Sequence, residues 1–259
     1  MKIKQLWQSS LTWILLLWCI LSIIYHCSLW MVVSGVVIWV IIIFISAPGV
    51  FWNHWSHFTF NQQKKEHWLT KAVSSRPQIF QPYLSLATIY IRNKRWADAA
   101  AILEPAIDLN HPRSGPDARI LLAIAYRESG NNDKAIEILT NLTSQGVKSF
   151  VVYMNLATTL FKNGKLEEAL PAAEKARSLD VKSSQPVLLM GRIHFEQHEY
   201  QKAKDDYEWS IKHLSWPVES YYWLGRSELE LNNLKAAQEN LQTAVNKIKD
   251  DPEMSDVPV

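Results

Sequence analysis

The chain has 259 residues, a formal net charge of +2 and 48% hydrophobic residues, and it contains only two cysteines. A near-neutral charge excludes a strong basic field that would attract nucleic acid or anionic substrates. The two cysteines, Cys19 and Cys27, offer neither a disulfide framework nor a C-x-x-C metal or redox site. Charge is unevenly placed, because residues 1–60 contain no Asp or Glu and only two Lys.

Residues 1–52 are predicted to form a membrane hairpin. The chain is almost wholly apolar here over about twice the length that one bilayer span needs. We therefore predict two transmembrane helices, Leu6–Tyr25 and Leu29–Phe44, joined by a tight turn. The alternative is a secretory signal peptide followed by one span, but no A-x-A-like cleavage site stands out before Ser46.

Basic residues flank this hairpin on both sides, whereas its turn is uncharged. They are Lys2 and Lys4 before it, and Lys64, Lys65, Lys71 and Arg76 after it. Because Lys and Arg accumulate on the cytoplasmic side of a membrane, both ends of the hairpin are predicted to face the cytoplasm. The predicted localisation is the cell inner (plasma) membrane, with the following domain in the cytoplasm.

Residues 53–79 are predicted to be an interfacial linker with a possible capping helix at Gln63–Ser74. Trp55 and neighbouring aromatic residues suit an interfacial belt. His54 and His57 could instead ligate a haem or a metal, but an interfacial linker is the favoured interpretation.

Five alanines mark a repeat in the rest of the chain: Ala99, Ala135, Ala169, Ala203 and Ala237. They lie 36, 34, 34 and 34 residues apart. Before each of them, bulky and small residues recur at helical spacing, as in Tyr83, Leu86, Ala87 and Tyr90. A period near 34 residues predicts a stacked helix-turn-helix array, whose usual product is an extended concave surface for binding partners.

This arrangement resembles the tetratricopeptide repeat (TPR) family, in which an aromatic residue, Leu-Gly and Tyr in a first helix precede Ala in a second. The resemblance implies an all-α fold of two transmembrane helices followed by a right-handed solenoid of about five repeats over residues 80–248. His194 and Glu228 replace the usual tyrosine. The acidic, Pro-containing residues 249–259 are predicted to form a disordered tail.

The family resemblance also implies where partners bind, because first-helix residues form the concave face in this family. The corresponding positions predict a partner-binding groove of Arg92, Arg127, Asn155, Phe161, Arg192, Phe195, Tyr222 and Arg226. Arg pairs bidentately with carboxylates and stacks on aromatic rings, so the expected ligand is an acidic, apolar protein segment. The alternative is a set of solvated arginines on exposed turns.

Motifs for catalysis and for cofactors are absent from the sequence. There is no phosphate-binding glycine-rich loop, no dinucleotide-binding glycine motif and no serine nucleophile elbow. His194 and His198 are four residues apart, but the glutamate between them does not match H-E-x-x-H, so structural roles are favoured over a metal site. We predict a protein that is not an enzyme and that uses no cofactor, metal, nucleic acid or small-molecule substrate.

The sequence thus predicts a membrane-anchored scaffold that assembles or regulates a membrane complex through protein–protein interactions. In architecture it resembles membrane-anchored bacterial TPR proteins of cytochrome maturation and envelope biogenesis. Two alternatives stay open: an extracytoplasmic assembly chaperone, and an accessory integral subunit of a membrane enzyme complex. The identity of the partner does not follow from a fold.

Overall fold

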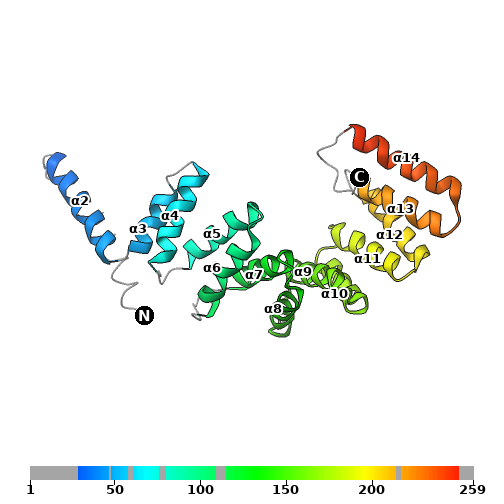
Figure 1. The fold of residues 1–259 in the computed structure, drawn as a ribbon, viewed down its shortest axis with the longest axis horizontal. Coiled ribbons are helices and arrows are strands. Elements are labelled where there is room, and N and C mark those ends of the chain that lie inside the picture. The colour runs from blue at the N-terminus through cyan, green and yellow to red at the C-terminus, as the bar shows by residue number, and fades with distance from the viewer. Residues whose placement is uncertain are drawn as a thin grey trace. The chain divides into compact units, whose positions relative to one another are not determined.

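A computed structural model describes residues 29–46, 48–57, 61–75, 80–108, 115–213 and 217–250. In these ranges every regular element is an α-helix (Figure 1). The chain divides into two compact units, one made of Met1–Lys94 with Asp108–Arg113 and the other of Arg95–Ile107 with Ser114–Val259. The boundary after Lys94 falls inside the predicted first repeat, between its two helices.

The first unit contains four described helices, which are α2 (Leu29–Ser46), α3 (Pro48–His57), α4 (Gln62–Ser74) and α5 (Gln81–Arg92). The predicted first span lies outside the described residues, and the predicted second span overlaps α2. Among the helices of the described ranges, none is both long enough and apolar enough to cross a membrane. The two transmembrane helices therefore stay a prediction.

Helix α3 was not expected from the sequence, which predicted a membrane segment and a linker over the same residues. Pro48 stands at its first position, where a missing N–H and a fixed φ are tolerated. Helix α3 packs against α4, and Trp52 stacks on Trp68 with ring centroids 4.9 Å apart. Helix α4 occupies the predicted capping helix and buries Leu69 and Ala72.

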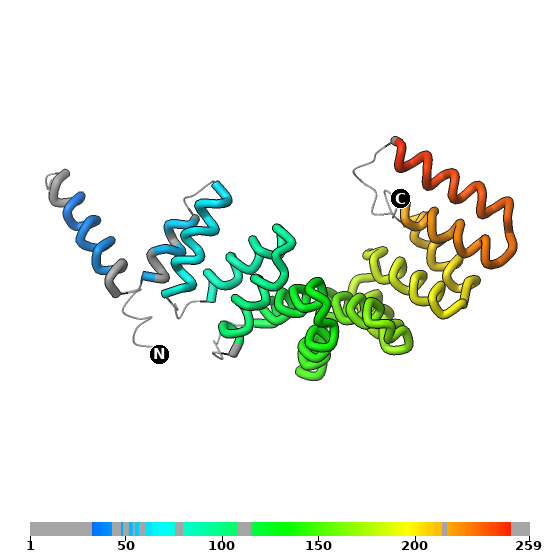
Figure 2. The backbone as a smooth tube through the Cα atoms, in the orientation of Figure 1, coloured from blue at the N-terminus to red at the C-terminus, as the bar shows by residue number. Residues whose placement is uncertain are grey.

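The second unit contains the repeating helices (Figure 2). Helix α6 (Trp96–Asp108) is followed by four helix pairs: α7 (Pro116–Glu128) with α8 (Asn132–Ser144), α9 (Phe150–Lys162) with α10 (Leu166–Leu179), α11 (Gln185–Glu196) with α12 (Tyr200–His213), and α13 (Val218–Glu230) with α14 (Leu234–Asp250). Each second helix of the first three pairs packs against the first helix of the next. The first helices α7, α9, α11 and α13 also contact one another in succession, so they share one side of this unit.

Small residues at matching positions allow the two helices of each pair to approach closely. The marker alanines Ala135, Ala169, Ala203 and Ala237 are all fully buried. In α11, a Cβ at Gly191 would lie 2.8 Å from the ring of Tyr207, which is itself fully buried. The 34-residue period of the sequence is therefore a period of tight helix–helix contacts.

The turns between paired helices repeat one backbone conformation. A residue with positive φ ends each first helix in the second unit, and these residues are Gly130, Gly164, His198 and Asn232. The next residue donates its N–H to a carbonyl five positions earlier, as in Asn131 to Tyr126 at 2.8 Å and Glu199 to His194 at 2.8 Å. This αL helix ending satisfies carbonyls that would otherwise lack a partner, and it begins the second helix at the same angle in every repeat.

Candidate protein-binding surface

The predicted site residues fall into three places in the structure. Arg92 is exposed near the end of α5 and belongs to the first compact unit. Arg127 and Asn155 join a polar network between α7 and α9. The remaining residues lie on α9, α11 and α13, where four of them form stacked contacts with a tryptophan that the sequence analysis did not select.

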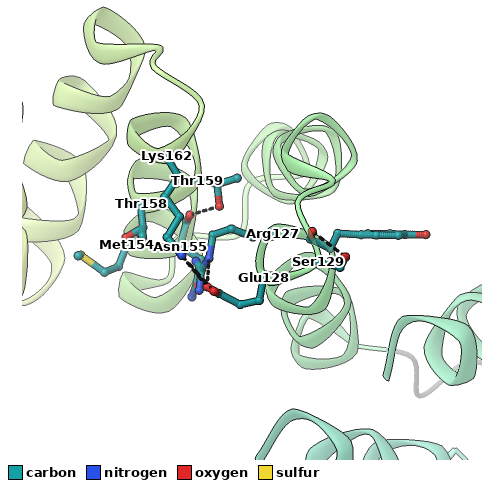
Figure 3. Close-up of polar contacts among 9 residues, drawn as sticks. Arg127, Glu128, Ser129, Met154, Asn155, Thr158, Thr159 and Lys162 are labelled. Carbon is teal, nitrogen blue, oxygen red and sulfur yellow. Dashed lines mark hydrogen bonds and ion pairs between the residues drawn. The ribbon is translucent and has the colours of Figure 1, made fainter. Parts of the chain in front are cut away.

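The polar network connects the first helices of two neighbouring repeats (Figure 3). Arg127 donates its Nε–H to Glu128 at 2.8 Å and an Nη1–H to Asn155 at 2.9 Å. Lys162 donates to both carboxylate oxygens of Glu128, at 2.9 and 3.0 Å. Glu128 and Lys162 are 34 residues apart, so opposite charges occupy the same position in adjacent repeats.

The network holds its charges in place rather than presenting them to a ligand. Burial disfavours the ionised form of Glu128, but the hydrogen bonds from Lys162 and Arg127 outweigh it and hold the pKa of this carboxyl below its ordinary value. The Arg127 side chain is only 12% exposed. Arg127 and Asn155, both predicted to bind a partner, are thus bonded to each other and link two repeats.

A second group, here called the Arg–aromatic cluster, consists of Phe161, Arg192, Phe195, Trp223 and Arg226. The guanidinium carbon of Arg192 lies 5.0 Å from the Phe161 ring centroid, and that of Arg226 lies 5.1 Å from the Phe195 centroid. Each arginine follows its phenylalanine by 31 residues, so the same contact occurs twice, one repeat apart. This repeated contact explains why both arginines lie on the same side of the unit.

Trp223 joins the two halves of the Arg–aromatic cluster. Its ring centroid is 5.2 Å from the Arg192 guanidinium and 5.0 Å from that of Arg226. Cation–π contacts at such distances contribute about 0.5–1 kcal/mol at exposed sites and more where water is excluded. A guanidinium stacked on a ring keeps its N–H groups available at its edge, where they can form a bidentate pair with a carboxylate.

The two arginines differ in the charges that surround them. Arg192 lies 3.9 Å from the carboxylate of Glu219, and its side chain is 39% exposed. Arg226 has no carboxylate oxygen within 4 Å in the part of the chain that the structure describes. Arg226 is therefore a partly buried, oriented cation whose charge is not neutralised by a described neighbour.

The predicted aromatic residues of the site also differ in exposure. Phe195 is only 8% exposed and packs in a core cluster with Ala203, Tyr207 and Leu224, so it supports Arg226 instead of covering a ligand. Tyr222 is half-buried and its ring meets Trp223 edge-on at 5.3 Å. The sequence analysis missed Trp223 because it followed an idealised register, although the 31-residue spacing from Arg192 to Trp223 matches that from Phe161 to Arg192.

The histidines of α11 and its following turn have separate partners. His194 is buried and its Nδ1 lies 2.8 Å from an oxygen of Asp206, whereas Nδ1 of His198 lies 2.7 Å from the Tyr200 hydroxyl. Burial raises the pKa of Asp206 although the contact with His194 opposes the shift. In the described ranges no group of three or more His, Cys, Asp or Glu could hold a metal ion.

Comparisons with known proteins agree with the repeats seen in the structure. Models of the tetratricopeptide repeat match residues 90–157, 151–179 and 188–252. The Hsp70-Hsp90 organizing protein of Triticum aestivum is 28% identical over 146 residues, which are 52% of this chain and 25% of that protein. The chain thus spans about a quarter of that relative's length.

Solved structures show the same fold at low sequence identity. MamA from Desulfovibrio magneticus RS-1 (residues 41 to the end) has a TM-score of 0.60 at 15% identity, covering 66% of this chain and 96% of that one. YrrB, described as a TPR protein with an unusual peptide-binding site, has a TM-score of 0.56 at 18% identity, covering 71% and 93%. At such identities the likeness extends to the fold alone.

Proposed function

Because this chain is a tetratricopeptide repeat protein, we propose that it is a membrane-attached scaffold that binds an acidic, apolar segment of a partner protein. The proposed binding surface is the side shared by α9, α11 and α13, with Arg192, Arg226, Tyr222 and Trp223 as its contact residues. Binding there would serve the assembly or regulation of a membrane complex. The relative in Triticum aestivum is named for organizing two other proteins, which is in keeping with a scaffold.

The observation that carries this proposal is the position of Arg226. Its guanidinium lies 5.1 Å from the Phe195 ring centroid and 5.0 Å from that of Trp223, and no described carboxylate neutralises it. A ligand carboxylate would gain a charge that is already oriented, so it would lose little side-chain entropy on binding. The rings around this charge would at the same time cover an apolar side chain of the ligand.

A peptide-binding measurement tests the proposal. Fluorescent peptides that combine Asp or Glu with Leu or Phe are titrated with the protein, and Asn and Gln versions of the same peptides serve as comparison. We expect the acidic peptides to bind more tightly, and the double variant Arg192→Glu, Arg226→Glu to weaken their binding at least tenfold, since desolvated charge pairs contribute a few kcal/mol. Arg226→Glu alone should have the larger effect, because Glu219 already lies beside Arg192.

The matched control reverses two exposed lysines on second helices, Lys175→Glu and Lys235→Glu, which changes the net charge equally. Binding by this control should stay within about twofold of the wild type, since solvated charges contribute little. Equal losses in the two double variants would mean that only net charge matters, and unchanged binding in the arginine variant would place the ligand on another surface.

The membrane attachment in this proposal is supported by the N-terminal composition and by α2. Six aliphatic side chains of α2 are between 38% and 56% exposed: Val33, Val36, Val37, Ile38, Ile41 and Ile42. An apolar helix surface of this kind is unfavourable in water and usually marks contact with a protein or a membrane. The uncharged run that includes α2 favours a bilayer, and the flanking lysines favour a cytoplasmic repeat domain.

A further inference from the structure

We propose that the α3–α4 hairpin carries a binding site for the headgroups of anionic phospholipids at the membrane surface. The site consists of Trp52, Trp55, Trp68, Lys64 and Lys71, here called the Trp–Lys cluster. The inference rests on the proposed membrane attachment, but it concerns a surface separate from the peptide-binding one and does not depend on any partner protein.

The aromatic part of the Trp–Lys cluster is built between two helices. Trp52 of α3 stacks on Trp68 of α4 with centroids 4.9 Å apart and planes within 6° of each other. Trp55, one turn further along α3, meets Trp68 edge-on at 6.5 Å and is 51% exposed. Indole rings have an apolar body and one polar N–H, and they accumulate at the depth of lipid headgroups for that reason.

Lys71 adds an oriented positive charge to these rings. Its Nζ lies 4.9 Å from the centroid of Trp52 and 4.9 Å from that of Trp68. Within the described part of the chain, neither Lys71 nor Lys64 has a carboxylate oxygen within 4 Å. The rings hold the ammonium group without neutralising it, so its N–H donors are available to a phosphate.

The helical register of α4 places the two lysines and Trp68 on one face. Lys64, Trp68 and Lys71 are four and three residues apart, which is the spacing of one helix face, and both lysines are exposed. Leu69 and Ala72, on the other side of α4, are fully buried. The cluster is therefore an outward-facing surface, and the packing of the hairpin does not require its lysines.

A bilayer is the occupant that matches both the charge and the surroundings of this cluster. Helices α3 and α4 contain three lysines and one acidic residue, Glu66, so the hairpin is positive. The exposed aliphatic surface of α2 ends directly before α3, and α2 packs against α3. A phospholipid supplies a hydrocarbon chain for the first surface and a phosphate for the second, whereas a soluble acidic protein would supply only the negative charge.

The test reconstitutes the full-length protein into vesicles and measures its lipid preference with spin-labelled phosphatidylglycerol and phosphatidylcholine. Flotation of the protein with pure phosphatidylcholine vesicles first establishes membrane attachment. We expect the wild type to associate more strongly with phosphatidylglycerol, and Lys71→Gln and Lys64→Gln each to lower this preference by up to about fivefold, as for a lysine near an anionic surface. High salt should lower the preference of the wild type in the same direction.

Lys175→Gln, an exposed lysine of α10 in the other compact unit, is the control and should keep the wild-type preference. The proposal is overturned if the double variant Lys64→Gln, Lys71→Gln floats with vesicles but keeps its preference for phosphatidylglycerol. A protein that floats with no vesicles would overturn membrane attachment as well. Peptide binding by the repeats is measured separately, so its outcome does not affect this result.

Discussion

Single residues at equivalent positions of the repeats meet quite different local demands. Tyr126, Leu160, His194 and Glu228 follow one another at 34-residue intervals at the end of their first helices. His194 and Glu228 are buried, so each needs a partner for its polar atoms. Asp206 provides it for His194, whereas Lys204 and Asn233 provide it for Glu228 at 2.8 and 2.6 Å.

Replacing Gly191 by Ala should destabilise the repeats although Ala is the better helix former. The added Cβ would lie 2.8 Å from the ring of Tyr207, which is buried and cannot move aside without displacing its neighbours. Overpacking of this kind typically costs about 1–3 kcal/mol. Thermal unfolding followed by circular dichroism measures the loss.

The control is Gly115→Ala, since no atom lies within 4 Å of a Cβ built there and its φ of −70° is open to alanine. This variant should melt within about 0.5 kcal/mol of the wild type, as most surface substitutions do. Equal melting temperatures for the two variants would mean that α11 and α12 are not in close contact.

Glu228 should make the stability of the protein depend on pH in the acid range. Burial disfavours its ionised form, but hydrogen bonds from Lys204 and Asn233 outweigh it and lower its pKa from an ordinary value of 4.5. Because the folded pKa is below the unfolded one, this carboxylate stabilises the fold above about pH 4.5, and the stabilisation is lost as the pH falls through the folded pKa.

We expect Glu228→Gln to lower the free energy of unfolding by about 1–2 kcal/mol at pH 7. The difference from the wild type should shrink as the pH falls below about 4.5, which melting curves over a pH series would record. Glu239→Gln, an exposed change on α14, should show no such effect. A difference that stays constant down to pH 3 would contradict the assigned role of the Lys204 pair.

At the scale of the helix pair, stability depends on the distance at which two helices pack. Ala169 of α10 is fully buried, and α10 packs against both α9 and α11. The N–H of Ala169 also donates to the carbonyl of Lys165 at the start of the helix, so the residue lies where α10 leaves its turn. This position has no space for a larger side chain.

Ala169→Trp should therefore disrupt the array and lower the melting temperature strongly, with a loss of about 1–3 kcal/mol or more. The same side chain introduced four residues earlier, Lys165→Trp, is exposed and should be nearly neutral. Melting of both variants under identical conditions separates the two cases. If both behave alike, the assigned repeat register is incorrect.

At the scale of the whole molecule, the main prediction concerns the side of the membrane on which the repeats lie. A phosphatase that is active only after export should be inactive when fused after Val259, whereas a fluorescent reporter that folds in the cytoplasm should be bright. The reason is the excess of lysines on both flanks of the N-terminal hairpin and the uncharged turn between them. The opposite result would favour the extracytoplasmic chaperone.

The division of the chain is also a property of the whole molecule. The sequence predicts a first repeat that begins at residue 80, yet α5 belongs to the compact unit of α2–α4 and α6 mainly to the other. A repeat pattern does not reveal such a boundary, because the helices on either side of it keep the same spacing of apolar residues. Helix α3 was missed for a related reason, since its aromatic residues suit a helix and an interfacial linker equally well.

The sequence by itself determined the repeat. Close helix–helix contacts require a small residue at one position, so buried alanines such as Ala135 and Ala169 recur at the period of the fold and can be recognised without coordinates. It also determined the general side of the partner surface, because the positions that face away from the second helix recur with the same period. Arg192 and Arg226 were selected in this way, and they do lie on one side of the unit.

Only the tertiary structure decided which of these side chains are available to a ligand. Arg127 is bonded to Asn155, 28 residues away, and Arg226 is held between Phe195 and Trp223 without a described carboxylate. Such pairings depend on side-chain directions and on distances of a few ångströms between helices that are distant in the chain. The period of the sequence places the helices next to each other, but the packing of individual side chains determines which charges are neutralised.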